Sequence, residues 1–328
     1  MDFSVQTALP APPPAGSPPA LSDQQFADLA EVPAESVWFA NIVNSCTRRA
    51  YRQDIEDFMA FAGIQEPADF RRVVRAHVIA WRTSLESREL EPSSIRRKLS
   101  ALSALYQYLC EANCVLFNPT MGVKRPSAGA NEGKTPAIGD DQARALLVAP
   151  SEKTVKGKRD RAVLATFLFH ALRCAELCAL DVKDLEQRSG VMHLRVHGKG
   201  GKIRFIPVHP AAQQRITEYL AAAGHGEDLD GPLFRPVKNS RSGELRKPLS
   251  LGAVYARIVK FYADQVGIDL SGFGPHSLRA TAATNALDHQ ADIAKVQEWL
   301  GHANISTTRM YDRRKTKPED SPTFKVSY

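Results

Sequence analysis

Apolar residues recur with helical spacing from about residue 36 onward. In the stretch TRRAYRQDIEDFMAFAG they return every three or four positions, which places them on one face of an amphipathic helix and turns the basic residues elsewhere. The apolar face comprises Tyr51, Ile55, Phe58, Met59 and Ala62, and the basic residues include Arg48 and Arg49.

Two more amphipathic helices complete a predicted N-terminal block. The first has Val74, Val78, Trp81 and Leu85 on its apolar face, and the second has Ile95, Leu99, Leu102, Tyr106 and Leu109. The second is expected to open at Ser93 or Ser94 as its N-cap, and Asn118-Pro119 is expected to end the block. Its first turn carries Arg96, Arg97 and Lys98. Basic residues there oppose the helix dipole unless a phosphate neutralises them, so this turn is either a DNA contact or a solvated basic face.

The second half of the chain combines further helical spacing with one stretch of period two. Apolar and polar residues alternate in the stretch VMHLRVHGKGGKIRFIPV, on both sides of Gly198-Lys199-Gly200-Gly201. This pattern predicts a β-hairpin with a glycine-rich turn. Helices are expected at about 139–149, 159–180, 250–266, 276–288, 291–300 and 306–313. The predicted fold class is therefore mostly α with a small β-sheet.

Changes in composition divide the chain into five segments. Residues 1–35 are rich in Pro, Ala and Ser and are expected to form a disordered tail. The stretch TMGVKRPSAGANEGKT has no period and predicts a linker, which we place at 123–135. A helical domain at 36–122, a second domain at 136–315 and a C-terminal tail at 316–328 complete the organisation.

The charge balance favours a polyanionic partner. The 328 residues include 43 Lys+Arg and 36 Asp+Glu, for a net charge of +7, and nucleic acid is the first partner to consider. The opening MDFSVQTALP lacks the basic and apolar regions of a secretory signal, and no uninterrupted apolar run is long enough to span a bilayer. The sequence predicts a cytosolic protein without a membrane partner.

The 5 cysteines do not suggest a disulfide framework, because their number is odd. His170, Cys174 and Cys178 recur every four residues, so on one helix they would offer three zinc ligands. Structural zinc sites usually take ligand pairs from separate elements. Reduced thiols are the preferred interpretation, and no metal site is predicted.

Three short motifs in the second half carry candidate chemistry. Arg173 lies among apolar residues in HALRCAEL and needs an anionic partner, which Glu176 can supply as a purely structural ion pair. Lys199 lies at the expected hairpin tip, where a lysine either enters a groove or solubilises the turn. His276 and Arg279, three residues apart at a helix start, project from one face.

A fourth motif is GHANISTTRMYDRR, in which Tyr311 follows His302 by nine residues. On one straight helix these side chains would point roughly 180° apart. They converge only if the chain turns between them. Gly301 can end the preceding helix and Ser306 can cap the next one, so the sequence provides for such a turn.

The order of these motifs resembles that of the tyrosine recombinase, or phage integrase, family. The matching pieces are Arg173 in an R-x-x-E-L turn, Lys199 in G-K-G-G-K, His276-x-x-Arg279, Leu300-Gly301-His302 and Tyr311. The resemblance covers about residues 37–315, because the N-terminal block looks like that family's core-binding domain. It implies a two-domain DNA clamp, with a helical, SAM-like core-binding domain and a mixed α+β catalytic domain. The layout is most similar to Xer-like and transposon- or integron-associated bacterial recombinases.

The resemblance implies a reaction that the side chains suit. Arg173 and Arg279 would stabilise the charge on a five-coordinate phosphorus, because a guanidinium is always charged and grips two oxygens. His302 would add a donor. Tyr311 would attack and form a 3′-phosphotyrosyl link, which stores the bond energy and allows rejoining without ATP.

The resemblance also implies the proton transfers. Lys199 is the candidate general acid for the departing 5′ oxygen, and His276 would move a proton at the tyrosine or orient the phosphate. Because two arginines stabilise the charge, neither a metal nor another cofactor is expected.

The implied partners are double-stranded DNA with paired inverted core sites and three further copies of the chain. Such a homotetramer exchanges strands through a Holliday junction, in integration, excision or resolution, with or without a partner recombinase or accessory protein, in the bacterial cytoplasm at the nucleoid. The C-terminal tail is expected to dock on a neighbouring protomer through Phe324 and Val326. The expected DNA contacts are Arg48, Arg49, Arg96, Arg97, Lys98 and Lys202.

Two departures from the family pattern leave the catalytic groups in place. Ala280 stands where many relatives carry a second His, and Gln290 occupies a turn where Gly is common. The alternatives are a type IB-like DNA-relaxing enzyme, an accessory DNA-binding protein without catalysis, and a metal-dependent transposase or nuclease. The complete set of catalytic residue types argues against the accessory protein.

Overall fold

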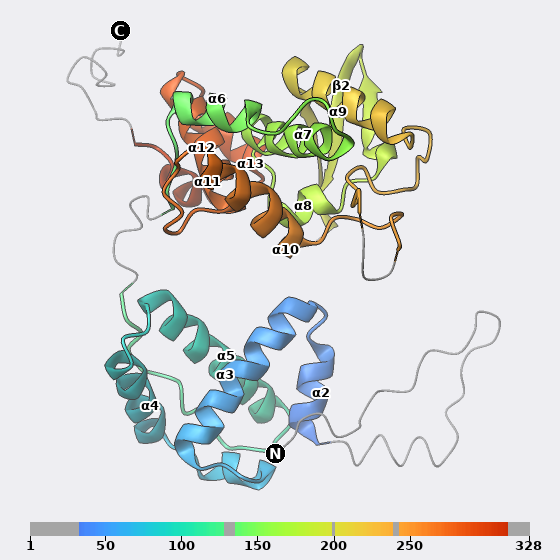
Figure 1. The fold of residues 1–328 in the computed structure, drawn as a ribbon. Coiled ribbons are helices and arrows are strands. Elements are labelled where there is room, and N and C mark those ends of the chain that lie inside the picture. The colour runs from blue at the N-terminus through green and yellow to red at the C-terminus, as the bar shows by residue number, and fades with distance from the viewer. Residues whose placement is uncertain (1–32, 128–134, 199–200, 239–242, 314–328) are drawn as a thin grey trace, which may run out of the picture. The chain divides into compact units, whose positions relative to one another are not determined.

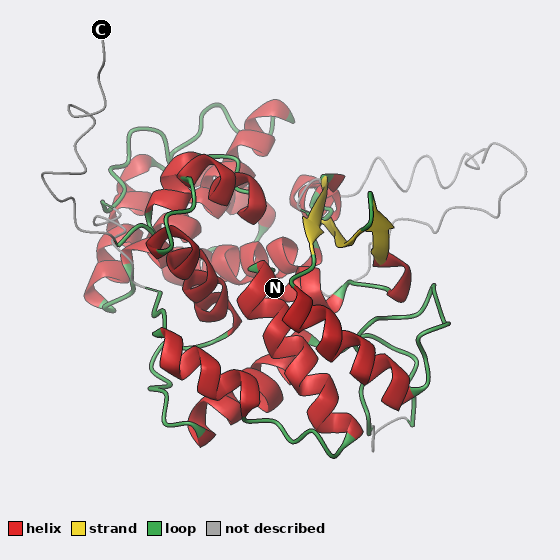
Figure 2. Ribbon diagram, turned by 90° about the horizontal axis from the view of Figure 1, so that it is seen from above, coloured by secondary structure: helices red, strands yellow, loops and turns green. Residues whose placement is uncertain are grey.

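The computed structural model describes residues 33–127, 135–198, 201–238 and 243–313. The chain forms two compact units, Met1–Ala130 and Asn131–Tyr328. Helices dominate both, and the second also contains a three-stranded sheet (Figure 2), so the predicted fold class is confirmed. The predicted disordered tail up to residue 32, the tail residues Phe324 and Val326, and Lys199 lie outside the described residues.

The first unit is a helical bundle (Figure 1), and its core includes several aromatic side chains. Trp81 is fully buried and meets Phe58 edge to face, with 5.0 Å between ring centroids. Tyr51 stacks on Trp38. The apolar positions singled out by their spacing are therefore the ones that pack together. The elements are α2 (Ala34–Asn41), α3 (Ser45–Ala62), the 3₁₀ helix η1 (Pro67–Arg72), α4 (Arg75–Ser87) and α5 (Pro92–Glu111).

Helix α5 begins earlier than its serines indicated. Its N-cap is Glu91 and its first residue is Pro92, so the expectation of a cap at Ser93 or Ser94 was wrong. Proline suits this position because its fixed φ is helical and the amide hydrogen it lacks would have no helical acceptor. Residues just beyond the bundle also pack on it. Arg82 donates to the carbonyl of Lys124 (3.1 Å) and Arg96 to that of Pro126 (3.2 Å), which ties the start of the predicted linker to α4 and α5.

The second unit is built around α7, which packs against α9 and α12 (Figure 1). Its helices are α6 (Asp140–Val148), α7 (Val155–His170), α8 (Cys174–Cys178), the 3₁₀ helix η2 (Val182–Asp184), α9 (Pro210–Ala223), α10 (Leu251–Val254), the π-helix η4 (Tyr255–Lys260), α11 (Phe261–Gln265), α12 (Pro275–Asp288), α13 (Ile293–Leu300) and α14 (Ile305–Arg309). The core of this unit combines α7 with one face of the sheet.

The sheet contains the predicted hairpin. Strands β1 (Leu185–Arg188), β2 (Val191–His197) and β3 (Ile203–Pro207) are antiparallel and lie in the order β1-β2-β3. Leu194 pairs with Ile206, and both side chains are buried in the core. Val196 on the same face pairs with Arg204, so period two places a basic side chain at an inward position of β3.

The helix predicted at 159–180 is divided in two. Ala171 has a φ of 51°, in the left-handed region, and the chain reverses there between α7 and α8. His170 ends α7, whereas Cys174 and Cys178 belong to α8, so these three residues do not share one helix as the sequence had suggested. Across the described ranges, no group of three or more His, Cys, Asp or Glu side chains could hold a metal ion.

His170 has a structural role in this reversal. Its Nε2 accepts from the amide of His209 (3.0 Å), and its Nδ1 lies 3.1 Å from the carbonyl of Thr166, to which it donates. Burial lowers the pKa of this imidazole to about 4, so it is neutral at neutral pH. In the part of the chain that is described, no helix is both long and apolar enough to cross a bilayer.

The start of α7 tolerates no side chain at Gly157. A Cβ built there would lie 1.9 Å from the carbonyl oxygen of Ser151, which is backbone and cannot move aside alone. We expect Gly157→Ala to lower the free energy of unfolding by about 1–3 kcal/mol through overpacking. Gly252→Ala in the first turn of α10 is the matched control, because nothing lies within 4 Å of its Cβ position. Urea denaturation measures both, and equal stability of the two variants would contradict the expectation.

Candidate active site

Arg173 is the N-cap of α8 and not an interior helical residue as predicted. Its amide donates to Glu176 Oε2 (2.8 Å) and its Nη1 to Glu176 Oε1 (2.7 Å), so the expected ion pair is present. The Arg173 side chain still has 39% of its surface exposed. Arg173 is therefore both held in place and accessible to a ligand.

Glu176 binds a second arginine, which belongs to none of the sequence motifs. Arg204 on β3 donates from Nη1 to Oε1 (3.0 Å) and from Nη2 to Oε2 (2.8 Å). Burial by itself raises the pKa of this carboxyl, but the bonds from Arg204 and from the Arg173 backbone lower it to about 2. The signal that could have identified Arg204 is its inward position in an alternating strand.

Arg279, in the first turns of α12, is buried, with only 1% of its surface exposed. Its Nη1 donates to the carbonyl of Ala171, and its Nη2 donates to the carbonyl of Leu300 (2.6 Å). Burial, followed by repulsion from Arg173, lowers the pKa of Arg279 to about 10, so it remains charged at neutral pH. Its guanidinium joins the α7–α8 reversal to the end of α13.

His302 lies next to Arg279. Its Nε2 is 3.0 Å from Arg279 Nη2 and its Nδ1 is 2.9 Å from Thr308 Oγ1. Since Arg279 can only donate, Nε2 accepts and Nδ1 carries the proton. Burial and the charge of Arg279 lower the pKa of His302 to about 4, so the ring is neutral at neutral pH. A donor role toward phosphate requires the other tautomer.

The predicted turn brings Tyr311 to His302. Gly301 ends α13 with a φ of 65°, as expected, but the cap of α14 is Asn304, whose side chain accepts from the amide of Ser306. The prediction of Ser306 as the cap was therefore wrong by two positions. The rings of His302 and Tyr311 stack with centroids 6.0 Å apart.

Tyr311 and His276 complete the cluster. Tyr311 is 4% exposed and packs among small residues of α12 and the end of α13. Tyr311 also has a small electrostatic effect that raises the pKa of Arg279. Burial, then the charges of Arg279 and Arg173, lower the pKa of His276. Arg173, His276, Arg279, His302 and Tyr311, which are dispersed over 139 positions of the chain, are thus gathered in one place.

Both units match known domains. Residues 42–113 match the phage integrase N-terminal SAM-like domain, and residues 137–317 match the phage integrase family. The chain belongs to the phage integrase family.

Curated relatives extend this match over most of the chain. Tyrosine recombinase XerC of Thermodesulfovibrio yellowstonii is 32% identical over 278 residues, which cover 82% of this chain and 85% of the relative. Tyrosine recombinase XerD of Pseudomonas putida is 32% identical over 280 residues, or 84% of this chain and 89% of that protein.

Solved structures share the fold at lower identity. XerH recombinase in a post-cleavage complex with a palindromic difH substrate has a TM-score of 0.66 at 18% identity, over 89% of this chain and 81% of that one. A lambda integrase dimer bound to a COC′ core site has a TM-score of 0.62 at 16% identity, over 90% and 98% of the two chains.

The surroundings of Ala280 and Gln290, the two departures from the family pattern, are seen in the structure. Ala280 is fully buried in the cluster that contains Tyr311, where an imidazole would need a buried partner. Gln290 follows α12 with a φ of 66°, a conformation that glycine adopts without strain. The sequence resemblance had marked this turn as a usual glycine position, and its backbone explains why.

The expected DNA contacts of the integrase N-terminal unit differ in how accessible they are. Lys98 is 9% exposed and its ammonium lies 3.3 Å from Asp54 and 3.1 Å from Asp57. Arg97 also pairs with Asp54. Because buried Asp54 needs counter-charges, Lys98 neutralises the interior of its own unit, and its contact with DNA stays a prediction.

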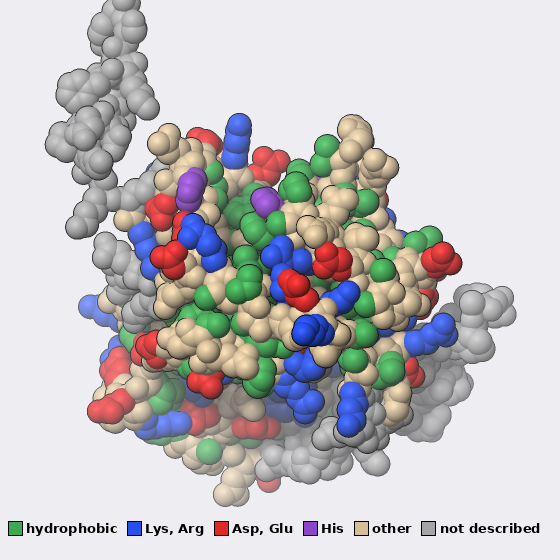
Figure 3. Space-filling model, turned by 45° about the horizontal axis from the view of Figure 1, so that its top comes forward, with side chains coloured by type: hydrophobic (Ala, Val, Ile, Leu, Met, Phe, Trp, Pro, Cys, Tyr) green, Lys and Arg blue, Asp and Glu red, His purple; other side chains and the backbone are tan. Residues whose placement is uncertain are grey.

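The other expected DNA contacts stay predictions. Arg48 donates to the carbonyl of Ile42 (2.7 Å) and so supports the link between α2 and α3. Arg49, Arg96 and Lys202 are exposed. On the face shown in Figure 3, Lys and Arg side chains lie among Asp and Glu side chains and do not form one uninterrupted basic patch.

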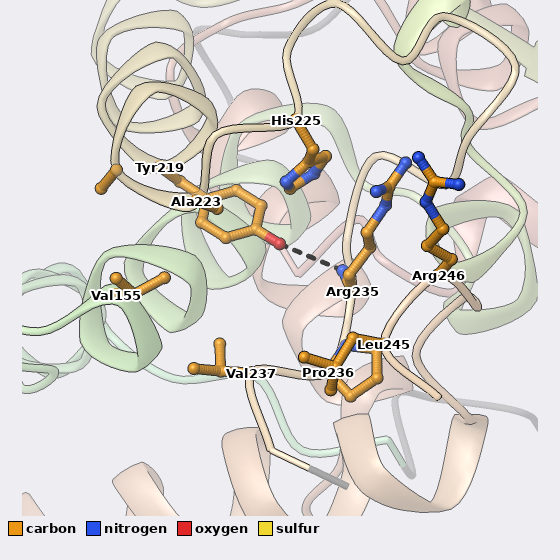
Figure 4. Close-up of a pocket in the computed structure, with 10 residues that line it drawn as sticks. Val155, Tyr219, Ala223, His225, Arg235, Pro236, Val237, Leu245 and Arg246 are labelled. Atoms are coloured by element: carbon orange, nitrogen blue, oxygen red, sulfur yellow. Dashed lines mark hydrogen bonds between the residues drawn. The ribbon is translucent and has the colours of Figure 1, made fainter. Parts of the chain in front are cut away.

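A pocket of about 250 Å³ (Figure 4) has none of the five clustered residues in its lining. Tyr219, Val237 and Leu245 form part of its apolar lining, and its basic side chains are His225, Arg235 and Arg246. The Tyr219 hydroxyl accepts from the amide of Arg235 (3.1 Å). Arg235 forms an ion pair with Asp228 (2.5 Å). The positive charge of Arg235 in this pocket is therefore already compensated.

The neutral His302 predicts a pH dependence of stability. In the unfolded chain this histidine binds a proton once the pH falls below its ordinary pKa of 6.5. In the folded chain it does so only near pH 4, because its pKa is lowered to about 4. The free energy of unfolding therefore falls as the pH falls through this window. In His302→Gln the number of protons taken up on unfolding should decrease by about one. The free energy of unfolding should therefore fall less steeply as the pH falls. His170 keeps a similar contribution in both proteins.

Chemical denaturation at a series of pH values measures this slope. His289→Gln, at an exposed position after α12, controls for the loss of a histidine. An identical slope in wild type and His302→Gln would contradict the assignment of a neutral, proton-resisting His302.

Proposed function

We propose that this chain is a site-specific DNA recombinase that cleaves and rejoins DNA through a 3′-phosphotyrosyl intermediate on Tyr311. The observation that carries the proposal is the chain of contacts from Tyr311 to a buried cation. The tyrosine ring stacks on His302, and His302 accepts a hydrogen bond from Arg279 (3.0 Å). A nucleophile beside fixed cationic donors is the arrangement that phosphoryl transfer requires.

The charges of the site support a phosphate ligand. Arg173, Arg204 and Arg279 gather around one carboxylate, Glu176, so cations exceed anions in this group. Burial of Arg279 strengthens its field and keeps it from relaxing during the reaction. In the pentacoordinate transition state, Arg173 and Arg279 stabilise the two negative nonbridging oxygens. A metal ion is then not needed for charge stabilisation.

The reaction balances without external energy. The Tyr311 oxygen forms a bond to phosphorus as the bond to the 5′ oxygen breaks, and the tyrosyl proton passes to a base. His276, whose pKa is lowered by burial and by Arg279, is neutral and can accept it. Lys199, which lies between β2 and β3 in the sequence, protonates the 5′ oxygen. The reverse attack by a 5′ hydroxyl restores a phosphodiester, so ATP is not consumed.

The relatives support the partners that we propose. XerH is bound to a palindromic difH substrate and lambda integrase is a dimer on a core site, which favours double-stranded DNA with paired inverted sites for this chain. Four copies would exchange strands through a Holliday junction, in integration, excision or resolution, including that of a mobile element. Strand exchange is favoured over a type IB-like relaxing activity because the SAM-like N-terminal domain is matched as well.

The nucleophile is tested by removing one oxygen atom. We expect Tyr311→Phe to bind DNA as wild type does and to form no covalent adduct, because its ring still packs against His302. The substrates are nicked duplexes with a randomised central segment, incubated in EDTA. Adducts are captured by denaturation, and the trapped strands are sequenced to identify the preferred site.

Tyr262→Phe is the matched control for this test. The Tyr262 hydroxyl donates to Asp160 (3.0 Å) in a separate buried network, so its removal should leave the adduct in place. An adduct on Tyr311→Phe would disprove the assignment of the nucleophile, and cleavage without an adduct that occurs only with divalent metal would favour a metal-dependent nuclease. Adducts without strand exchange between two selected sites would favour a relaxing enzyme.

Arg279 is tested by comparing cleavage with binding. Arg279→Ala should slow single-turnover cleavage by about 10²–10³-fold, because a cation that stabilises the transition state is lost. The affinity for the selected duplex should change far less, since many phosphate contacts share it. Arg279→Lys, which keeps the charge, guards against misfolding of the alanine variant. Equal losses in cleavage and binding would make Arg279 an anchor only.

A further inference from the structure

The carboxylate of Glu176 is shared equally between two arginines. Oε1 accepts from Nη1 of Arg173 (2.7 Å) and of Arg204 (3.0 Å). Oε2 accepts from the Arg173 amide (2.8 Å) and from Arg204 Nη2 (2.8 Å). The four lone-pair positions of the carboxylate are therefore all occupied. Glu176 can rotate only if the two-pronged grip of Arg204 is broken.

Arg204 also lies against the turn that carries His302. A Cβ built on Gly301 would be 3.3 Å from Arg204 Nη1 and 3.4 Å from its Cδ. The Gly301 amide belongs to the C-terminal turn of α13, and its φ of 65° aims the following residue, His302, at Arg279. The Arg204 guanidinium thus contacts both Glu176, which holds Arg173, and Gly301, which precedes His302.

The charge count gives Arg204 a second effect. Arg173 and Glu176 alone would form a neutral ion pair, and the carboxylate would draw the guanidinium away from an incoming phosphate. With Arg204 present, the three groups carry a net positive charge. The side chain of Arg204 is 16% exposed and that of Glu176 is 6% exposed, so water screens this balance only weakly.

We propose that Arg204 is a positioning residue for recombination: it fixes and neutralises Glu176, so that Arg173 is aligned on the scissile phosphate with its charge available. The inference rests on the proposed function, because it assigns Arg173 to that phosphate. Arg204 acts through Glu176 and Arg173, and it is therefore distinct from the groups that touch the reacting atoms.

Single-turnover adduct formation on the duplex selected above measures the effect. Arg204→Met should slow it by about a hundredfold, the scale of a misplaced catalytic group, with little change in affinity for the duplex. Arg204→Lys should recover part of the rate, since lysine restores the positive charge but not the pair of guanidinium donors that binds both oxygens of Glu176. Full activity in Arg204→Met would overturn the proposal.

Arg195→Met is the matched control. Arg195 lies on the neighbouring strand β2, points to the other face of the sheet, and donates from Nε to buried Asp184 (2.9 Å). This variant loses the same charge and also leaves a buried acid without its arginine, so it reproduces a purely structural defect. The expected rate is that of wild type. An equal slowing in both variants would make Arg204 a structural residue only.

A double-mutant cycle tests the route of action. In an Arg173→Lys background the further change Arg204→Met should slow adduct formation little, because the group that Arg204 aligns has already lost its fork. Multiplicative losses would mean that Arg204 acts independently of Arg173, and the proposal would fail.

A second readout does not depend on cleavage. In NMR spectra of the guanidinium nitrogens, the Arg173 signals should shift in Arg204→Met, because Arg173 then pairs with a carboxylate that no second arginine shares, and should match wild type in Arg195→Met. Arg173 signals that are the same in all three proteins would overturn the inference even if DNA is cleaved. Absence of a Tyr311-dependent adduct in wild type would instead overturn the proposed function, while the NMR comparison still decides the role of Arg204.

Discussion

The buried guanidinium of Arg279 is the interaction on which the arrangement of the site depends. A charge that is 1% exposed is tolerated only if polar groups surround it, and here the acceptors come from separate segments. The carbonyl of Ala171 belongs to the reversal between α7 and α8, the carbonyl of Leu300 to the end of α13, and the ring of His302 to the turn beyond. Satisfying this one cation therefore brings Arg173 and Tyr311 to the same place.

The same requirement explains the strain at Ala171. A left-handed alanine is less favourable than a glycine, yet its carbonyl accepts directly from Arg279. The backbone conformation and the buried charge thus stabilise each other. Burial, followed by repulsion from Arg173, lowers the pKa of Arg279, and Arg204 adds a smaller repulsion, so like charges lie in proximity here. A phosphate between them would relieve that repulsion.

The first unit treats its basic residues differently. Asp54 is 1% exposed and lies beside Arg97 and Lys98, so part of the basic first turn of α5 compensates a buried acid. Arg49 and Arg96 remain exposed on the same helical block. The basic residues of this unit are consequently of two kinds. Some neutralise a buried acid, and others lie on the surface, where their charge is accessible to a ligand.

Local spacing in the sequence was sufficient for most of the helices, their apolar faces and the hairpin, because period and turn chemistry depend on neighbouring residues. It missed the division at Ala171 and did not predict α9. Ile55, Phe58 and Trp81 were recognisable as core for this reason. The motifs also identified Arg173, His276, Arg279, His302 and Tyr311 as candidates, since the family resemblance preserves their order. The cap at Asn304 and the start at Pro92 were missed because several residues nearby were equally suitable.

Only the tertiary structure decided how charges are paired. Arg204 and Arg195 are close together on one hairpin, yet one grips Glu176 beside the site and the other Asp184 away from it. Lys98 looked like its neighbour Arg96 until Asp54 was found beside it. Pairing depends on distances between elements that are remote in the chain and on the local exclusion of water, and neither is encoded in the spacing of residues along the sequence.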